Sequence, residues 1–284
     1  FSSSASCVLM VGSKPVFVDI DEDTFCITPE NIKKAITPRT KAIIPVHLMG
    51  HPADMDGIMK LGLPVIEDAA QALGAEYHGK KVGTIGDCGI FSFNQSKHVS
   101  SGEGGMLVTN NDHIARVSRA VRNHGEVSDP DLKIVGYNYR MCEVEAVIVR
   151  EQFKKLDKRN AHRMMLTSYM NEKLKELGGF VTPIVKPNCT HVYYTYSAKY
   201  NRPEMTRDEF QDKLIQKGVY FGKGYVKPLY MLPVYQKFGY KEGMCPVAER
   251  MWQSELMVTD RLRYPATTED IDSMIKVMKE VLSG

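Results

Sequence analysis

Two short apolar runs decide the fold: KAIIPV at residues 41–46 and LPVIE at residues 63–67, with a helix-like segment at residues 54–61 between them. Consecutive apolar positions predict a strand buried on both faces, and strands that alternate with helices predict βαβ units. An earlier run, PVFVD at residues 15–19, precedes a helix with Pro29 in its first turn. The first part of the chain is therefore predicted to form an α/β fold, with a parallel sheet covered by helices on both sides.

The rest of the chain divides into two parts of different pattern. Short strands, a glycine-rich connection and helical segments are expected at residues 87–109, 112–123 and 143–177. Beyond the glycine pair at 178–179, strands and capped helices are expected at residues 193–200, 206–217, 219–221 and 268–282. We therefore expect a large domain at residues 1–159, then a linking helix and a smaller C-terminal α+β domain at residues 160–284.

The composition narrows the class of protein. The chain has 284 residues, of which 43% are hydrophobic and 25% charged, values typical of globular proteins. The net charge of +3 is spread along the chain, which does not favour nucleic acid or an anionic membrane as a partner. Six cysteines lie far apart without a C-x-x-C pair. This spacing is typical of free thiols in a reducing compartment and predicts a cytoplasmic protein.

Several common site motifs are missing from the sequence. His47 and His51 have H-x-x-x-H spacing, but no H-E-x-x-H occurs, and no metal site is predicted. The glycine-rich stretch at residues 102–105 is not followed by G-K-[ST], and no G-x-G-x-x-G follows a predicted strand. No G-x-S-x-G is present either. Nucleotide hydrolysis, a dinucleotide site and an α/β-hydrolase are thus not indicated.

Asp68 directly follows the run at residues 63–67, which places it at the carboxyl end of a buried strand. Ligands bind at that edge in open α/β sheets. A carboxylate there costs desolvation free energy unless a cation meets it, and a pyridinium nitrogen is one such cation. Capping of the next helix is the commoner role for an aspartate in this position. Position alone leaves both roles open.

Lys97 lies in a polar turn after the predicted strand that contains Ser92. A lysine amine in a partly dry pocket becomes nucleophilic, as covalent attachment of a carbonyl cofactor requires. The hydroxyl of Ser92 would face the same edge and could donate to a phosphate. Taken singly, a loop lysine is usually a solvated surface group and a strand serine is usually a buried, hydrogen-bonded one.

Together these segments resemble the DegT/DnrJ/EryC1/StrS family of fold-type-I, pyridoxal-phosphate (PLP)-dependent aminotransferases. The resemblance rests on short segments in the family's order and extends over nearly the whole chain. They are PVFVDID at 15–21, ITPRTKAIIPVH at 36–47, EDAAQALGA at 67–75, GKKVG at 79–83, FSFNQSK at 91–97, GEGG at 102–105, GYNYRM at 136–141 and PLY at 228–230. It implies a three-layer αβα fold like that of aspartate aminotransferase, with a smaller C-terminal domain.

The resemblance also implies a role for individual residues. Lys97 matches the lysine that binds PLP covalently as a Schiff base, and Asp68 the carboxylate that pairs with the pyridine nitrogen. Gln71 matches the residue beside the phenolic oxygen of the ring, and Ser92 matches a phosphate ligand. Phe1 matches an aromatic residue that stacks on the ring. Asn138 matches an asparagine that reaches the phosphate from the neighbouring subunit, which implies a homodimer with shared active sites.

The start of the chain departs from the family pattern. The family has more chain ahead of the position of Phe1, including a Ser/Gly-Gly-Thr turn that opens a helix whose N-terminus holds the cofactor phosphate. A beginning of Phe-Ser-Ser-Ser is also unusual for a complete protein. We therefore expect that the N-terminal part of the large domain is absent from this sequence.

The family implies transamination from glutamate or glutamine to a nucleotide-linked keto sugar, in amino-sugar biosynthesis for surface polysaccharide, glycan or antibiotic. Amination of a cyclitol ketone and a PLP-binding regulatory protein without turnover are the alternatives. Deoxysugar dehydration is disfavoured, because that branch has histidine in place of Lys97. Polar and aromatic residues gather late in the chain, where two interpretations stay open. They either line the substrate pocket or lie on the surface of the small domain: Tyr193, Tyr194, Lys223, Tyr225 and Lys227.

Overall fold

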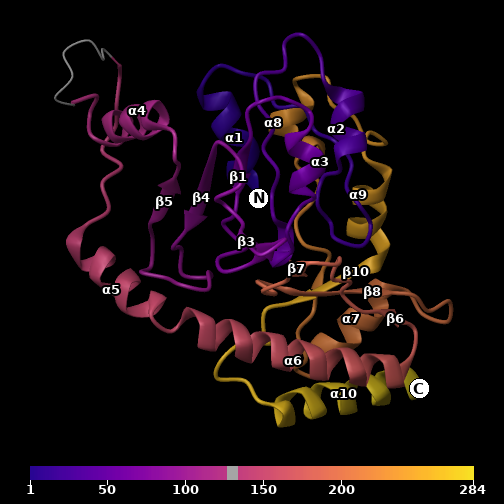
Figure 1. The fold of residues 1–284 in the computed structure, drawn as a ribbon. Helices are drawn as coiled ribbons and strands as arrows, with labels where there is room; N and C mark the ends of the chain where they lie inside the picture. Colours follow the sequence, from indigo (N-terminus) through magenta and orange to yellow (C-terminus); the bar gives the residue numbers. More distant parts are fainter. Residues whose placement is uncertain (127–133) are drawn as a thin grey trace.

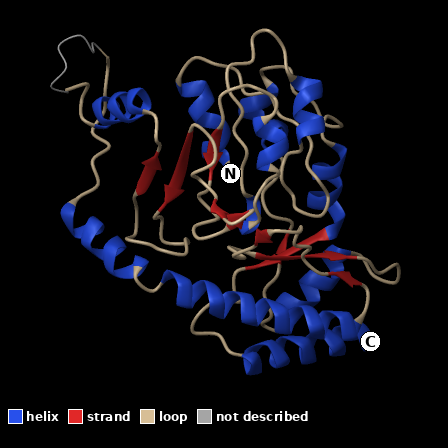
Figure 2. Ribbon diagram, in the orientation of Figure 1, coloured by secondary structure: helices blue, strands red, loops and turns tan. Residues whose placement is uncertain are grey.

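The computed structural model describes residues 1–126 and 134–284. The ribbons in Figures 1 and 2 show an upper region, where helices surround a short sheet, and a lower region, where two long helices run beneath an antiparallel sheet. The α-helices are α1 (Ser2–Met10), α2 (Pro29–Ala35), α3 (Met55–Met59), α4 (Asp112–Arg122), α5 (Glu143–Phe153), α6 (Leu156–Leu177), α7 (Arg207–Gln216), α8 (Pro233–Gln236), α9 (Pro246–Arg250) and α10 (Thr268–Ser283).

Strands and short helical turns complete the described elements. The 3₁₀ turns are η1 (Leu48–Gly50) and η2 (Leu229–Met231), and η3 (Met251–Glu255) is a π-helical turn. The strands are β1 (Ile66–Asp68), β2 (Glu76–Tyr77), β3 (Lys80–Lys81), β4 (Cys88–Ser92), β5 (Gly105–Val108), β6 (Phe180–Val181), β7 (Cys189–Thr190), β8 (Tyr196–Tyr200), β9 (Gly222–Lys223) and β10 (Leu256–Thr259). They form three sheets, ordered β1-β4-β5, β6-β8-β10-β9 and β3-β2-β7.

The sheet β1-β4-β5 fixes the edge where the predicted site residues lie. Strand β1 runs parallel to β4, with Asp68 opposite Ile90. Strand β5 runs antiparallel to β4, with Gly105 opposite Ser92. Asp68 and Ser92 are the last residues of their parallel strands, so both lie at the same carboxyl edge of the sheet.

The apolar runs form less regular structure than their sequences suggest. Residues 41–46 lie parallel to β1, but only through isolated bridges at Ile43 and Val46. Pro45 interrupts the ladder because proline has no N–H to donate. The strand predicted at residues 15–19 is not confirmed: the segment is extended without a ladder, and Asp19 at its end accepts bonds from the backbone nitrogens at the start of α9.

A buried charge holds β1 in place beside the site. The Glu67 carboxylate is fully buried and accepts hydrogen bonds from the backbone N–H groups of Gly83, Ile85 and Gly86, 2.6–2.7 Å away. Its fourth donor is His47 Nε2 at 3.0 Å. This nitrogen carries the ring hydrogen, because the other ring nitrogen of His47 accepts from the backbone N–H of Ala53. Burial alone would raise the pKa of Glu67, but the His47 and backbone donors lower it, so the group stays a carboxylate.

Local capping accounts for most of the helix boundaries. The Thr28 hydroxyl accepts from Asn31 N at the start of α2, and Thr206 forms the predicted capping box of α7 with Glu209. The terminal helix is confirmed as α10. The stretch predicted at residues 143–177 is instead two helices, α5 and α6, which are separated at residues 154–155.

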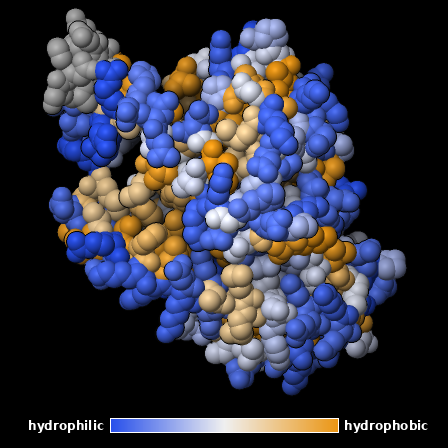
Figure 3. Space-filling view, viewed as in Figure 1, coloured by the Kyte–Doolittle hydropathy of each residue, from blue (hydrophilic) through white to orange (hydrophobic). Residues whose placement is uncertain are grey.

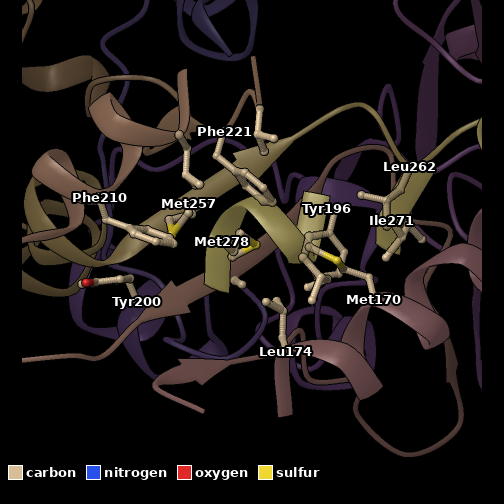
Figure 4. Packing of buried hydrophobic residues seen from close by; sticks show 14 of the residues in the cluster. Met170, Leu174, Tyr196, Tyr200, Phe210, Phe221, Met257, Leu262, Ile271 and Met278 are labelled. Atoms are coloured by element: carbon tan, nitrogen blue, oxygen red, sulfur yellow. The ribbon is translucent and has the colours of Figure 1, made fainter. Parts of the chain in front are cut away.

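The lower region has its own hydrophobic core, shown in Figure 4. Leu166, Met170 and Leu174 of α6 pack against residues of β8, β10, α7 and α10, and each is at most 1% exposed. Full burial of one such side chain stabilises the fold by roughly 1.5–3 kcal/mol. Leu156 at the start of α6 instead packs with Phe93 and Val99 of the upper region. These two packings support our proposed boundary near residue 159.

The chain returns to the upper region before it ends. Ala5 of α1 shares a core with Tyr230, Tyr235 and Tyr240, which lie in and around η2 and α8. Phe17 packs edge-on against Tyr235 and Tyr240, with ring centroids 5.5 and 5.1 Å apart. Figure 1 shows α8 and α9 beside α1, α2 and α3, so the second half of the chain contributes to both regions.

Candidate active site

Lys97 lies in the connection between β4 and β5, where its backbone N–H closes a turn onto the carbonyl of Asn94. The side chain is half-buried, and Nζ lies 4.4 Å from the centroid of the Tyr194 ring. Of the salt bridges among the described residues, none includes Lys97. The predicted lysine is therefore neither an exposed surface group nor part of an ion pair.

Asp68 is buried, with 8% of its surface exposed. Its Oδ2 accepts a hydrogen bond of 2.7 Å from the Ser4 hydroxyl, and its Oδ1 accepts one of 3.2 Å from Ala70 N. The second bond closes the turn after β1, and because no helix begins there, the helix-capping role is not observed. No salt bridge to Asp68 occurs within the described part of the chain. A buried carboxylate without a cationic side chain is the arrangement that a bound cation would complete.

Phe1 lies close to both of these groups. Burial lowers the pKa of the Phe1 amino group, while the charge of Asp68 raises it and that of Lys97 lowers it further. The Phe1 side chain is 59% exposed and lines a mainly apolar cavity of about 200 Å³ together with Tyr225 and Leu48. The structure thus brings Phe1, Asp68 and Lys97 to one place.

Gln71 is fixed by hydrogen bonds at both ends of its amide. The side-chain oxygen accepts from Met49 N at 2.8 Å, and Nε2 donates to the Tyr225 hydroxyl at 2.6 Å. Burial raises the pKa of Tyr225 to about 12, so its hydroxyl is protonated at neutral pH. The amide orientation is therefore set, and one hydrogen of Nε2 stays available for a ligand.

Ser92 and Asn138 have different surroundings. The Ser92 oxygen accepts from Asn94 N at 3.3 Å, which leaves its hydroxyl hydrogen free to donate at the same sheet edge as Asp68. Asn138 is exposed on the segment that joins α4 and α5. Its side-chain oxygen accepts from Arg140 N, and no recorded contact joins it to Lys97, Asp68 or Gln71. The structure therefore does not bring Asn138 to the site within one chain.

The five plausible pocket residues separate into two groups. Tyr194 contacts Lys97, and Tyr225 and Lys227 line the cavity beside Phe1. Tyr193 instead stacks on His191 with ring centroids 3.8 Å apart, and Lys223 forms a salt bridge with Asp212 at 2.7 Å. Only the first group faces the site.

Three buried histidines support the connection that carries Lys97. His98 is 4% exposed, and its Nε2 donates to the Val192 carbonyl at 3.2 Å. Burial, with a further contribution from the charge of Arg163, lowers the pKa of His98 to about 3. Burial also lowers the pKa of His51 and of His191, whose rings meet edge-on at 5.4 Å. All three are neutral at pH 7.

These histidines predict a loss of stability in acid. The unfolded chain binds a proton on His98 near pH 6.5, whereas the folded chain does so only near pH 3, so the stability falls as the pH drops between these values. We expect His98 to contribute a decrease of about 2 kcal/mol in the free energy of unfolding between about pH 7 and 5. Denaturant unfolding of the wild type and of His98→Asn at several pH values measures it. Parallel pH dependences of the two proteins would contradict the prediction.

A larger cavity of about 660 Å³ lies elsewhere, at the edge of the lower sheet. The charged groups on its wall are already paired: Arg250 with Glu22 and Glu255, and Arg207 with Asp208. The charges named here satisfy one another, in contrast to Lys97 and Asp68, which have no salt-bridge partner in the described part of the chain. Within the described ranges, no cluster of His, Cys, Asp and Glu is suited to a metal ion, and no helix combines the length and apolarity needed to cross a membrane.

Several contacts at the site were not predicted from the sequence. The Ser4 hydroxyl donates to Asp68, and the Ser96 hydroxyl shares a hydrogen bond with the Tyr194 hydroxyl. Arg163 donates to the backbone carbonyl of Tyr194. The three adjacent serines at residues 2–4 give no local signal that one of them meets Asp68. Arg163 lies in a helix rich in charged residues, where a buried arginine has no distinguishing pattern.

Comparison with known proteins identifies the family. The sequence profile of the DegT/DnrJ/EryC1/StrS aminotransferase family matches residues 1–279. A pleiotropic regulatory protein of Geobacillus stearothermophilus is 40% identical over 259 residues, which cover 88% of this chain and 68% of that protein. A UDP-N-acetyl-3-dehydro-alpha-D-glucosamine 3-aminotransferase of Acidithiobacillus ferrooxidans is 37% identical over 293 residues, covering 100% of this chain and 76% of the relative.

The fold agrees with this match. The solved structure of an aminotransferase from Psychrobacter cryohalolentis has a TM-score of 0.90 to this chain at 32% identity, covering 100% of this chain and 79% of the other. The expected aminotransferase fold is thus confirmed. The chain belongs to the DegT/DnrJ/EryC1/StrS family of PLP-dependent aminotransferases.

Proposed function

We propose that this aminotransferase moves an amino group from glutamate or glutamine to a nucleotide-linked keto sugar, and that Lys97 binds the cofactor covalently. One observation carries the site assignment: the half-buried amine of Lys97 and the buried carboxylate of Asp68 both act on the Phe1 amino group, and neither has a salt-bridge partner in the described chain. The substrate class is supported by the relative from Acidithiobacillus ferrooxidans, whose name describes a nucleotide-sugar aminotransferase.

The residues present fit PLP. The Asp68 carboxylate lies at the carboxyl edge of β1 and lacks a cationic partner, which suits a pyridinium nitrogen. When bound, PLP supplies a ring that withdraws electrons from the bond to the reacting carbon. Ser92 retains a free hydroxyl hydrogen for the phosphate, and Gln71 retains one amide hydrogen for the phenolic oxygen.

Each proposed role follows from the surroundings of the residue. Lys97 is the group that carries a proton to and from the substrate carbon, because its half-buried amine has no salt-bridge partner among the described residues. Asp68 is held at both oxygens, by Ser4 and by Ala70 N, so its charge stays at a fixed place and would pair with the ring nitrogen of bound PLP. Phe1, which caps the start of α1, would cover one face of the ring.

We also propose a homodimer with shared sites. An apolar surface lies over α5 and β5 and consists of Met106, Leu107, Val144, Val147 and Ile148, all exposed. Figure 3 shows this apolar colour in the hollow between α5 and β5. A second copy would cover it and would place the exposed Asn138 at the neighbouring site. Sedimentation analysis tests this, and a single-chain mass at micromolar concentration would contradict it.

The substrate proposal is tested with the purified protein and PLP. Glutamate and glutamine are supplied as donors to a panel of nucleotide-linked keto sugars and cyclitol ketones. We expect 2-oxoglutarate to form from glutamate in equal amount to an amino sugar, and we expect turnover with the nucleotide sugars to exceed that with the cyclitols. Faster turnover of a cyclitol ketone would instead favour the cyclitol reading.

The regulatory alternative has its own support, because a relative at 40% identity is named a pleiotropic regulatory protein. The two readings differ in the number of cycles per site. A regulatory protein without turnover would release at most one equivalent of 2-oxoglutarate per site, whichever acceptor is added. Repeated cycles with any keto sugar would exclude it.

A further inference from the structure

The contact between Lys97 and Tyr194 joins the two regions of the chain. Lys97 belongs to the β4–β5 connection, while Tyr194 lies just ahead of β8 in the lower sheet. The Lys97 Nζ lies 4.4 Å from the centroid of the Tyr194 ring, a distance at which a cation is attracted to the ring face. In the part of the chain that the structure describes, this ring takes the place of a carboxylate partner.

Tyr194 is held by two hydrogen bonds, and its backbone lies close to Gly50. Its hydroxyl shares a hydrogen bond of 2.9 Å with the Ser96 hydroxyl, next to Lys97 in sequence. Its carbonyl accepts from Arg163 at 3.1 Å. Its backbone nitrogen lies against Gly50, where an added Cβ would approach it to 3.0 Å. Gly50 has φ +97, so any other residue would be strained there as well.

Arg163 extends this support into α6. It is 6% exposed and donates to the carbonyls of both Tyr193 and Tyr194. Burial, and then the nearby charge of Arg263, lower the pKa of Arg163 to about 10, so it is still charged at neutral pH. A buried arginine bound to two carbonyls of one turn fixes that turn more strongly than neutral donors would.

The charge of Lys97 acts on the Phe1 amino group ahead of α1 and on the neutral His98. Asp68 also acts on the Phe1 amino group, but its two oxygens accept hydrogen bonds from Ser4 and Ala70. The Lys97 Nζ lies over the face of the Tyr194 ring, which is the contact that the proposal concerns.

We propose that Tyr194 is a positioning residue that holds the free side chain of Lys97 as an ammonium group over its ring, between the two proton transfers. This rests on the proposed role of Lys97. The ring keeps the proton on Lys97 and Nζ at a fixed place, and Ser96 and Arg163 keep the ring in place. The small domain thereby acts directly on the reacting amine.

The test measures the free amine directly. The full chain is loaded with pyridoxamine phosphate, which leaves Lys97 unattached, and trinitrobenzenesulfonate then labels unprotonated amines. Mass spectrometry of the Lys97 peptide gives the labelling rate at about pH 7 relative to the plateau that the rate reaches at high pH, where the amine is fully deprotonated and access alone controls it. The proteins compared are the wild type, Tyr194→Leu, Tyr194→Phe and, as the matched control, Tyr193→Leu, because the Tyr193 ring stacks on His191 instead.

We expect this ratio to increase about 2- to 30-fold in Tyr194→Leu, the range that corresponds to the loss of a cation–π contact. Tyr194→Phe retains the ring and is expected to keep the wild-type ratio, as is Tyr193→Leu. An unchanged ratio in Tyr194→Leu overturns the proposal, and so does an equal increase in Tyr194→Phe or Tyr193→Leu.

Two further measurements keep the result interpretable. If Tyr194→Leu does not fold, Ser96→Ala releases the tyrosine hydroxyl, and we expect an increase of about 2-fold; an unchanged ratio there overturns the proposal. Borohydride trapping of the wild type with PLP separately locates the attached lysine. Trapping at another lysine, with the Tyr194→Leu increase intact, would refute the proposed function while leaving the ring contact standing.

Discussion

Lys97→Ala is expected to abolish covalent attachment of PLP and to lower transamination by about 10⁴-fold. The variant loses both the amine that binds the cofactor and the group that moves the proton. Among the described residues, Lys97 is the lysine that lies over the Tyr194 ring. Borohydride reduction followed by peptide mass mapping measures attachment, and 2-oxoglutarate release from glutamate measures the reaction.

Lys80→Ala is the matched control, since Lys80 is an exposed lysine on the short strand β3. It should leave both attachment and rate unchanged. The fold should also survive in Lys97→Ala, because Lys97 is only half-buried and its backbone turn onto Asn94 does not need the side chain. Attachment of PLP at full stoichiometry in Lys97→Ala would remove Lys97 from the mechanism.

Asp68→Asn is expected to lower the turnover number by about 10²- to 10³-fold while leaving attachment of PLP to Lys97 intact. Asparagine keeps the size of the side chain and can still accept from Ser4, but it carries no charge to oppose the ring nitrogen. The loss should therefore affect the chemical step more than binding. Steady-state kinetics with glutamate, with borohydride trapping in parallel, separate the two.

Asp112→Asn, at the exposed start of α4, is the control for loss of a negative charge. An Asp68→Asn variant that retains the wild-type turnover number would mean that the aspartate only caps the turn at Ala70. Loss of attachment together with turnover would indicate damage to the pocket, which circular dichroism of the protein would detect.

The sequence predicts where Asp68, Ser92 and Lys97 lie in the fold because their places follow local rules, while their roles at a site stay predictions. Asp68 and Ser92 end buried strands, and parallel strands bring their carboxyl ends to one edge. Lys97 follows within a few residues of β4, so its place depends on a single short connection. The capped helices α2 and α7 are predicted for the same reason, since their signals lie within one turn.

Features that depend on distant contacts could not be predicted in this way. The Ser4 bond to Asp68 spans 64 positions, and the bond from Ser96 to Tyr194 spans 98. The run at residues 15–19 has the pattern of a strand, yet Asp19 binds the start of α9 instead of a neighbouring ladder. Pattern alone cannot reveal which partner a segment meets. The division at residue 159 stays a prediction for the same reason, because η2 and α8 pack against α1.

That return of the chain to α1 also affects how the protein is made. The ribosome completes α1, the sheet β1-β4-β5 and Lys97 long before it delivers Tyr225, which fixes Gln71, and Tyr230–Tyr240, which cover Ala5. During this interval the nascent first half exposes the apolar face that those tyrosines later bury. Contacts this distant in sequence form slowly, and exposed apolar surface invites aggregation or chaperone binding. The proposed cofactor pocket is therefore assembled only after residues 225–240 have been made.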